Sequence, residues 1–322
     1  MRAPEFWGRD AGWQAALLAP LAGLYALAAR ARQRKPGWMA PVPVICVGNL
    51  VVGGAGKTPA ALAIQHYLGE RGLAAHFLSR GHGGRLPGPL RVDPERHSAA
   101  DVGDEPLLLA AQAPAWIARD RAAGAKAAIA GGAPALILDD GFQNPGLEKT
   151  VSLIVVDGGY GFGNGRVLPA GPLRETVEDG LARAQAVVLV GEDVTGTAER
   201  LAGRLPVLTA RLEPGAGQAL EGRRLLAFAG IGRPEKFFAT LRQNGAELVE
   251  TTAYPDHHPY DPAEIDTLVR RARSQEAVPI TTRKDWVRLT AEQKRQIEVL
   301  DIQLVWDDPA GLAPLFDSLL PA

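Results

Sequence analysis

The chain alternates between short apolar runs and longer segments in which apolar residues recur every three or four positions. The short runs, many of them β-branched, predict buried strands, and the longer segments predict helices. Strand runs lie at 42–47, 74–78, 133–138, 151–156, 186–190, 207–212, 225–229, 278–282 and 297–306, and helical spacing occurs at 59–67 and 107–113. This alternation is typical of an α/β fold with a mostly parallel sheet and flanking helices.

The most informative stretch is residues 42–62, which read VPVICVGNLVVGGAGKTPAAL. An apolar strand leads into a glycine-rich turn, then Lys57 and Thr58, then an alanine-rich helix. In this arrangement backbone N–H groups face phosphates, the lysine reaches the β- and γ-phosphates, and the hydroxyl binds magnesium. The strict pattern has glycine where Val51 stands, so the flanking strand and helix support the assignment. We therefore expect a P-loop NTPase-like sheet whose nucleotide-binding residues are Val51, Val52, Gly53, Gly54, Ala55, Gly56, Lys57, Thr58 and Pro59.

A second strand delivers acidic residues at its end. The apolar run 133–138 continues directly into Asp139, Asp140, Gly141, Phe142 and Gln143. P-loop enzymes hold magnesium with an aspartate at the carboxyl end of such a strand. The sequence therefore predicts that Asp139 or Asp140 lies beside Lys57 and Thr58.

Several loops carry polar residues whose roles the pattern leaves open. Residues 79–84 form a basic glycine-rich loop, and Asp104 and Glu105 begin a helix, where a capping role would suffice. The stretch 158–175 is rich in glycine and proline, as either a substrate loop or a linker would be. In 254–260, His257 and His258 are adjacent, so they are poor joint metal ligands, but one could be a catalytic histidine held by an acid.

The N-terminal segment has no charged residue from 11 to 29 and is followed by Arg30, Arg32, Arg34 and Lys35. A secretory signal is disfavoured because export would separate a nucleotide site from ATP. A spanning helix needs about 20 apolar residues, which this segment barely provides. We expect a helix that lies on the membrane surface, with the basic residues on anionic headgroups. A helix packed on the protein's own core is an equal alternative, and different faces of one helix can serve both.

Composition narrows the class of protein. The chain has 322 residues, of which 46% are hydrophobic and 22% charged, as in a globular protein of two domains. A net charge of −1 argues against a general nucleic-acid binder. Cys46 is the single cysteine, which excludes a disulfide within the chain and fits a reducing cytosol. We expect three parts: the N-terminal helix and basic cluster over 1–38, a P-loop domain over 39–158, and a smaller α/β lobe over 159–322, whose last strand returns to the first domain.

Taken together, these motifs resemble the tetraacyldisaccharide 4'-kinases of lipid A biosynthesis. The similarity runs in order through VGNLVVGGAGKTP, LSRGHGG, VGDEP, LILDDGFQN, GNGRVLPAGPLRE, YPDHHPY and TTRKDW, after the uncharged N-terminal helix. The family's phosphate loop also lacks the first glycine, in agreement with Val51. The chain departs from the family at His82, where a tyrosine is expected.

The resemblance implies an enzyme at the cytoplasmic face of the inner membrane that uses ATP and Mg²⁺ to phosphorylate the 4'-hydroxyl of a lipid-linked glucosamine disaccharide. It implies no nucleic-acid partner and no obligate protein partner. Asp104 takes the role of base, with His257 as its partner and Lys57 as the third catalytic residue. The expected metal-site residues are Thr58, Asp139, Asp140, Glu105 and Glu175, and the expected substrate-binding residues are Arg80, His82, Asn164, Arg174 and Gln143.

Two other functions remain compatible with the P-loop alone. A membrane-associated P-loop ATPase could act as an assembly or insertion factor, although the motifs at 168–175 and 254–260 would then have no role. A soluble small-molecule kinase would be indifferent to detergent or bilayer. Dependence of turnover on a lipid acceptor distinguishes these functions.

Overall fold

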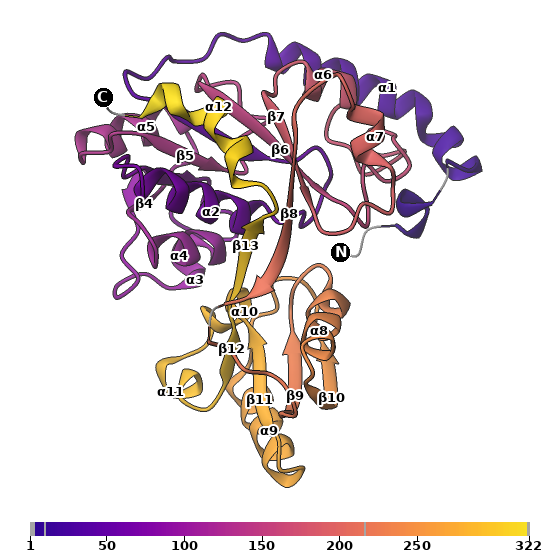
Figure 1. The fold of residues 1–322 in the computed structure, drawn as a ribbon, viewed down its shortest axis with the longest axis vertical. Helices are drawn as coiled ribbons and strands as arrows, with labels where there is room; N and C mark the ends of the chain where they lie inside the picture. The colour runs from indigo at the N-terminus through magenta and orange to yellow at the C-terminus, as the bar shows by residue number, and fades with distance from the viewer. Residues whose placement is uncertain (1–3, 10, 216, 321–322) are drawn as a thin grey trace.

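The structure is a computed structural model that describes residues 4–9, 11–215 and 217–320. It contains two sheets, one above the other in Figure 1. We call the nine-stranded sheet with its helices the large lobe, and the four-stranded sheet with its helices the small lobe. This agrees with the predicted class, a mostly parallel α/β sheet with flanking helices and a second, smaller α/β lobe.

The large sheet has the order β13-β8-β7-β6-β1-β5-β2-β4-β3, and all neighbours are parallel except β13 with β8 and β3 with β4. Central strands such as β1, β6 and β7 are buried along their whole length, which explains why they read as continuous apolar runs. The strands are β1 Val44–Gly48, β2 His76–Ser79, β3 Leu90–Arg91, β4 Ala115–Ile117, β5 Leu136–Asp139, β6 Val151–Asp157, β7 Ala186–Val190, β8 Val207–Pro214 and β13 Ile302–Trp306.

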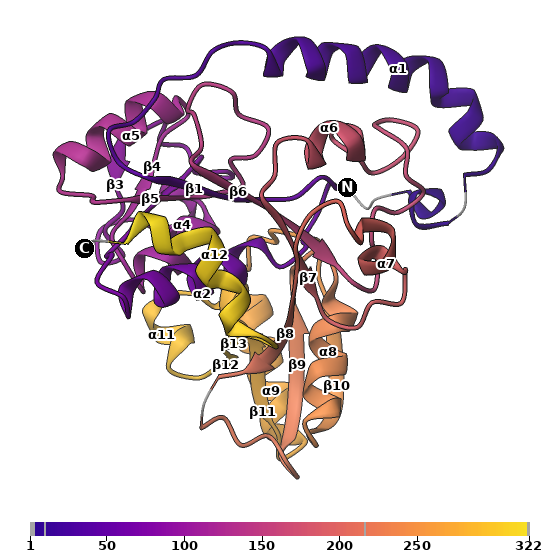
Figure 2. The ribbon, with the colours of Figure 1, turned by 45° about the horizontal axis from the view of Figure 1, so that its top comes forward.

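Helices cover both faces of this sheet (Figure 2). On one face α2 and α12 pack together, and the rings of Tyr67 and Phe316 are 6.0 Å apart. On the other face lie α5 and α6. The helices of the large lobe are α1 Trp13–Gln33, α2 Lys57–Gly69, α3 Ala99–Val102, α4 Asp104–Ala110, α5 Arg121–Ala130, α6 Val177–Leu181, α7 Thr197–Leu201 and α12 Ala313–Phe316, with 3₁₀ turns at Glu5–Gly8, Pro309–Leu312 and Asp317–Leu319.

The small lobe is a parallel sheet of order β10-β9-β11-β12 between two amphipathic helices. Side chains of β9 alternate between the faces: Leu225 and Ala227 pack with Phe238 of α8, and Phe228 packs with Leu268 of α9. The elements are β9 Arg224–Ala229, β10 Glu247–Ala253, β11 Val278–Thr282, β12 Glu298–Leu300, α8 Pro234–Gln243, α9 Pro262–Ser274, α10 Arg283–Trp286 and α11 Ala291–Lys294.

The single strand predicted over 297–306 is wrong in one respect, because it forms two strands in different sheets. β12 pairs with β11 in the small lobe, whereas β13 pairs antiparallel with β8 in the large lobe. The break falls at Asp301. Its carbonyl accepts from the N–H of Gly215, and its own N–H donates to the side chain of Gln218, so neither group bonds a residue of a neighbouring strand. The antiparallel pair β8 and β13 therefore joins the two lobes (Figure 1).

The expected domain boundary after residue 158 stays a prediction about folding units, but the sheets themselves divide elsewhere. β7 and β8 continue the large sheet beyond β6, and the chain enters the small sheet at β9. By sheet membership we propose to draw the boundary between 214 and 224, with β13 belonging to the large lobe.

Helix α1 lies along the outside of the large lobe, beyond α6 in Figure 2. Its small residues Ala15 and Ala22 are buried against Ala170. The opposite face is apolar yet exposed, with Leu17 at 72% and Leu24 at 66% of full exposure. By length and composition α1 is also apolar enough to cross a membrane. One face of α1 therefore packs on the protein and the other is apolar and exposed, and contact of the exposed face with a membrane stays a prediction.

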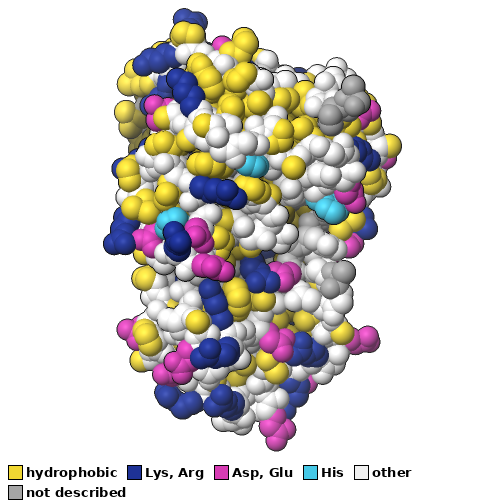
Figure 3. Space-filling model, turned by 90° about the vertical axis from the view of Figure 1, so that its left-hand side faces the viewer, with side chains coloured by type: hydrophobic (Ala, Val, Ile, Leu, Met, Phe, Trp, Pro, Cys, Tyr) yellow, Lys and Arg dark blue, Asp and Glu magenta, His cyan; other side chains and the backbone are white. Residues whose placement is uncertain are grey.

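Charges are mixed on the side of the molecule that Figure 3 shows. There, Lys and Arg side chains are interspersed with Asp and Glu over the small lobe, at the bottom, and apolar side chains gather toward the top of the large lobe. Neither sign of charge dominates this face.

Candidate active site

A cleft of about 2350 Å³ lies between the two lobes and is lined by residues from both. Small-molecule sites usually occupy about 300–1,000 Å³, so this cleft has room for two substrates side by side. Its floor is the carboxyl end of β1 and β5, in the middle of the large sheet. Open α/β sheets bind ligands at this edge, and here the phosphate loop leaves β1.

The phosphate loop has the conformation that its glycines allow. Gly56 precedes α2 with φ +86°, and Gly53 has φ +111°, both in the left-handed region. A side chain at Gly53 or Gly54 would meet open space, so this stretch of backbone faces the cleft. Lys57 lines the cleft, and its Nζ donates to Asn49 Oδ1 at 3.3 Å. Asn49 is completely buried, and sequence reasoning did not select it.

Thr58 and Asp139 meet beneath the loop, as predicted from the two strand ends. The Thr58 hydroxyl donates to Asp139 Oδ2 at 2.8 Å, whereas Asp139 Oδ1 is buried without a partner. Burial raises the pKa of the Asp139 carboxyl to about 7, despite the nearby Lys57. An unpartnered buried carboxylate oxygen beside a threonine hydroxyl fits a divalent cation.

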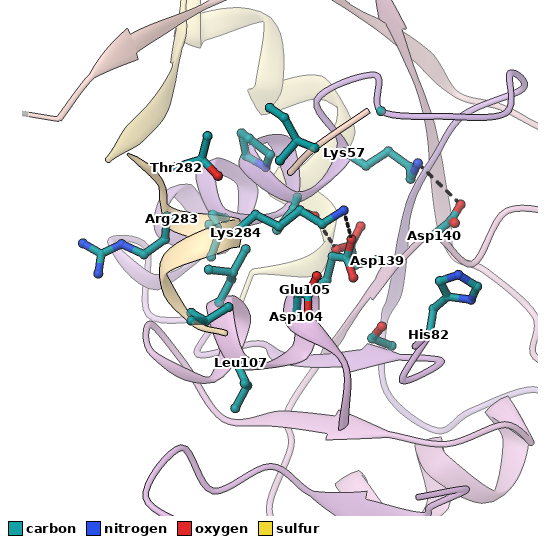
Figure 4. A pocket seen from close by; sticks show the side chains of 18 of the residues that line it. Lys57, His82, Asp104, Glu105, Leu107, Asp139, Asp140, Thr282, Arg283 and Lys284 are labelled. Atoms are coloured by element: carbon teal, nitrogen blue, oxygen red, sulfur yellow. Dashed lines mark hydrogen bonds and ion pairs between the residues drawn. The ribbon is translucent and has the colours of Figure 1, made fainter. Parts of the chain in front are cut away.

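Asp140, the next residue, has the opposite electrostatic environment. It adopts a left-handed backbone with φ +57°, and its carboxylate lies 2.9 Å from Arg174 Nη1 and 3.8 Å from Lys57 Nζ. Burial alone would raise the pKa of Asp140, but Lys57 and Arg174 hold it below its ordinary value. Figure 4 shows Lys57 and Asp140 pointing toward each other across the cleft wall.

A loop from residues 167–175 braces the phosphate loop. Val51 forms an isolated bridge with Leu173, and the N–H of Arg174 donates to the carbonyl of Leu50 at 2.7 Å. Gln143 completes the brace, since its Nε2 donates to the Asn49 carbonyl at 2.9 Å and to Glu175 Oε1 at 3.0 Å. Arg174 and Gln143 both line the cleft, and their expected role in substrate binding stays a prediction.

The expected metal-site residues do not all come together. Glu175 is bonded by Gln143 and Arg183 and is absent from the cleft lining, and Glu105 pairs with Lys284 at 2.9 Å. Among residues 4–9, 11–215 and 217–320, no group of three or more His, Cys, Asp or Glu residues is arranged to hold a metal. Thr58 and Asp139 are therefore the best-placed protein ligands. This suits Mg²⁺, which keeps several waters and takes its other ligands from phosphates.

Asp104 and His257 meet in the cleft although they come from different lobes. His257 Nδ1 lies 2.8 Å from Asp104 Oδ2, and Arg288 Nε donates to the same oxygen at 2.9 Å. Burial would raise the pKa of Asp104, but the bonds from His257 and Arg288 lower it below its ordinary value. His258 points elsewhere, toward Glu264 at 2.9 Å, so His257 is the histidine that faces Asp104.

Sequence reasoning missed the residues of the small lobe that hold this pair. Arg288 is almost completely buried between Asp104 and Asp285. Asp285 is itself fully buried and accepts bonds from Tyr260 Oη at 2.8 Å and the N–H of Gly230 at 2.9 Å. The motif TTRKDW contains Asp285, and the available signal was an arginine three positions later, the spacing that pairs side chains on one helical turn.

Of the other three expected substrate-binding residues, two lie in the cleft and one lies in a loop away from it. Arg80 and His82 line the cleft, and the His82 ring lies 6.0 Å from that of His257. Asn164 does not line it, because its amide donates to the Ala170 carbonyl at 2.9 Å and so fixes the glycine-rich loop.

Comparison with known proteins shows which family this chain is similar to. The family described as "Tetraacyldisaccharide-1-P 4'-kinase" matches residues 14–320. The tetraacyldisaccharide 4'-kinase of Rhodospirillum centenum is 61% identical over 327 residues, covering 99% of this chain and 97% of the relative, and that of Rhodospirillum rubrum is 54% identical, covering 99% and 98%. A crystal structure of LpxK from Aquifex aeolicus in complex with ATP has a TM-score of 0.78 and 26% identity, covering 95% of this chain and 99% of that one. These matches do not support the alternative of an ATPase that assembles or inserts proteins.

Proposed function

This chain belongs to the tetraacyldisaccharide-1-P 4'-kinase family, and on that basis we propose that it phosphorylates a lipid-linked disaccharide. ATP gives its γ-phosphate to the 4'-hydroxyl of a tetraacylated glucosamine disaccharide 1-phosphate, a step of lipid A biosynthesis. The observation that carries this proposal is one cleft in which a phosphate loop from the large lobe faces the Asp104–His257 pair.

The phosphate loop accounts for the binding of ATP. Backbone N–H groups of 53–56, the start of α2 and Lys57 supply positive charge to the β- and γ-phosphates. Thr58 and Asp139 would hold Mg²⁺, which would neutralise negative charge on the phosphates. Arg174 is held beside Asp140 at the same wall, where a cation can orient the transferred group.

The Asp104–His257 pair accounts for the acceptor, and its geometry favours exchanging the two expected roles. Asp104 Oδ2 already accepts from His257 and Arg288, and its pKa is lowered, so it is a poor proton acceptor. His257 has Nδ1 fixed by Asp104 and a second nitrogen, Nε2, directed away from it. We therefore assign proton removal to His257 Nε2, and to Asp104 the orientation of the ring.

This assignment determines where the proton goes and which bonds form and break. The acceptor hydroxyl loses its proton to His257 Nε2, and its oxygen forms a bond to the γ-phosphorus. The bond from that phosphorus to the β–γ bridging oxygen breaks, and ADP leaves. Lys57, which lines the cleft, would neutralise the charge that develops on the leaving phosphates.

Helix α1 accounts for access to the lipid acceptor in the membrane. The apolar face with Leu17, Leu21 and Leu24 has no protein partner to cover it among the described residues, and the acceptor's acyl chains are themselves membrane-embedded. We propose that this face lies in the bilayer surface at the cytoplasmic side, so that the cleft works at headgroup level. Anionic headgroups would be the partner of the basic residues that end α1.

The decisive assay uses purified protein with ATP, Mg²⁺ and tetraacyldisaccharide 1-phosphate in mixed micelles. We expect ADP release to depend on the lipid and the product to carry a new phosphate at the 4' position by NMR. Lys57→Ala should abolish transfer with little change of melting temperature, because the hydrogen bonds of Lys57 are long and Asp140, which lies 3.8 Å from Lys57, keeps its closer pair with Arg174. ADP release that is independent of the lipid would contradict the proposal.

A further inference from the structure

Lys284 of the small lobe reaches into the centre of the site. It is the second residue of α10, and its side chain is largely covered, at 23% of full exposure. Its Nζ lies 2.9 Å from Glu105 Oε1, 3.3 Å from His257 Nε2 and 3.6 Å from Asp256 Oδ1. Figure 4 shows this side chain directed at Glu105, next to Asp104 and Asp139. No step described so far uses it.

The contact with His257 has a direct chemical consequence. A lysine ammonium can only donate hydrogen bonds, so at 3.3 Å it occupies the lone pair of His257 Nε2. The other ring nitrogen, Nδ1, is already bonded to Asp104 at 2.8 Å. In this arrangement His257 has no free nitrogen with which to take a proton from any hydroxyl.

The acceptor hydroxyl must therefore arrive where Lys284 Nζ now lies. Glu105 and Asp256 provide two carboxylates that keep the ammonium paired when it leaves Nε2. A lipid sugar that is held by the rest of the cleft can supply the free energy for this displacement. A water molecule has no such additional contacts.

We propose that Lys284 guards His257 Nε2 and so makes the enzyme select the lipid hydroxyl over water. This inference rests on the proposed function, in which His257 is the base. With the guard in place, water at the γ-phosphate cannot pass its proton to Nε2. When the acceptor displaces Lys284, the proton passes to Nε2, the acceptor oxygen bonds the γ-phosphorus, and ADP leaves. Lys284 is thus a specificity-determining residue for the nucleophile.

A purely structural role for Lys284 predicts something different. If the Lys284–Glu105 pair only held the lobes together, its loss would lower transfer and hydrolysis by the same factor, and their ratio would not move. The guard predicts that the ratio of acceptor-independent ATP hydrolysis to phosphoryl transfer rises.

The experiment is to measure both rates in the full-length protein with Lys284→Met, which keeps the length of the side chain and removes the ammonium. We expect the hydrolysis-to-transfer ratio to rise about tenfold, the factor that corresponds to one ordinary hydrogen bond. Lys284→Arg, which retains a donor cation, should keep the ratio low. Lys126→Met, a lysine of α5 that stacks on Trp38, is the matched control and should leave it unchanged.

Two further variants separate the possible failures. His257→Ala in the Lys284→Met background should remove the extra hydrolysis, because that hydrolysis needs the exposed base. If His257→Ala alone retains full transfer, the base assignment in the proposed function is wrong. If His257→Ala abolishes transfer but Lys284→Met leaves the ratio unchanged, only the guard is wrong. Should Lys284→Met fold poorly by melting temperature, Lys284→Gln provides the same test, and an unchanged ratio overturns the guard equally.

Discussion

At the scale of single residues, the site depends on neighbouring groups whose environments differ sharply. Asp139 and Asp140 are adjacent in sequence, yet burial raises the pKa of Asp139 to about 7, while Lys57 and Arg174 outweigh burial at Asp140 and lower its pKa. The left-handed backbone at Asp140 turns the two carboxylates apart. One residue is thereby available to a metal, and the other anchors the cations at the cleft wall.

The raised pKa of Asp139 predicts a pH-dependent stability in metal-free protein. Between its ordinary value of 3.8 and its folded value of about 7, the folded state binds the Asp139 proton more tightly than the unfolded state. The free energy of unfolding contributed by this group is therefore complete below the lower value and declines as pH rises toward 7. Urea unfolding in EDTA across this range should show the decline in the wild type and a smaller one in Asp139→Asn. Identical slopes would show that Asp139 is already ionised in the folded protein.

Individual residues were predictable where one strand delivers them and not where the tertiary fold does. Lys57, Thr58 and Asp139 each follow an apolar strand closely, so the pattern locates them. Arg288 bonds Asp104 although the two are 184 positions apart in the chain. Lys284 pairs with Glu105 in the same way. Nothing in local spacing relates such residues, and only the packing of α10 against α4 brings them together.

At the scale of elements, α1 has more than one role along its length. Its middle carries the exposed leucines, whereas its last turns form hydrogen bonds with the large lobe. Gln33 Nε2 donates to the Gln143 carbonyl at 3.0 Å, and Arg30 Nε donates to Asp179 of α6 at 2.6 Å. Arg34 and Lys35 remain exposed at the helix end and are free to meet headgroups.

This division predicts two separable effects in the same helix. Arg34→Gln with Lys35→Gln should weaken binding to anionic vesicles by about 1 kcal/mol per residue, an effect that salt screens, and should leave kcat in micelles unchanged. Gln33→Ala should lower kcat in micelles, because Gln143 supports the phosphate loop, and should leave vesicle binding unchanged. Flotation with vesicles and micellar kinetics measure the two. If both variants changed both quantities, the helix would act as a single unit.

Elements were predictable where their apolar pattern is unambiguous. The strands at 186–190 and 278–282 match β7 and β11 in both bounds. The run 297–306 was not divided correctly, since its apolar pattern continues through the point where the chain passes from one sheet to the other. Hydrophobicity reports burial but does not report which sheet buries the strand.

At the scale of the whole molecule, opposite charges on the two lobes meet across the cleft. Asp104 pairs with Arg288, Glu105 with Lys284, and Asp157 at the end of β6 with Arg233 and Lys236 at the start of α8. The large lobe contributes the carboxylates and the small lobe the cations. The fold class was evident from the strand–helix alternation, but this complementarity arises only when β8 and β13 bring the lobes together.

The central claim is that the base is assembled from both lobes, and a double-mutant cycle on Asp104 and His257 tests it most directly. Asp104→Asn retains an oxygen that can accept from Arg288 and His257, so it alters charge with little change of shape. We expect each single change to lower kcat by about 10²- to 10⁴-fold, with the KM for ATP nearly unchanged. The double variant should be no slower than His257→Ala alone, because Asp104 acts through the ring. Losses that multiply, or an effect on ATP binding instead of kcat, would contradict the account.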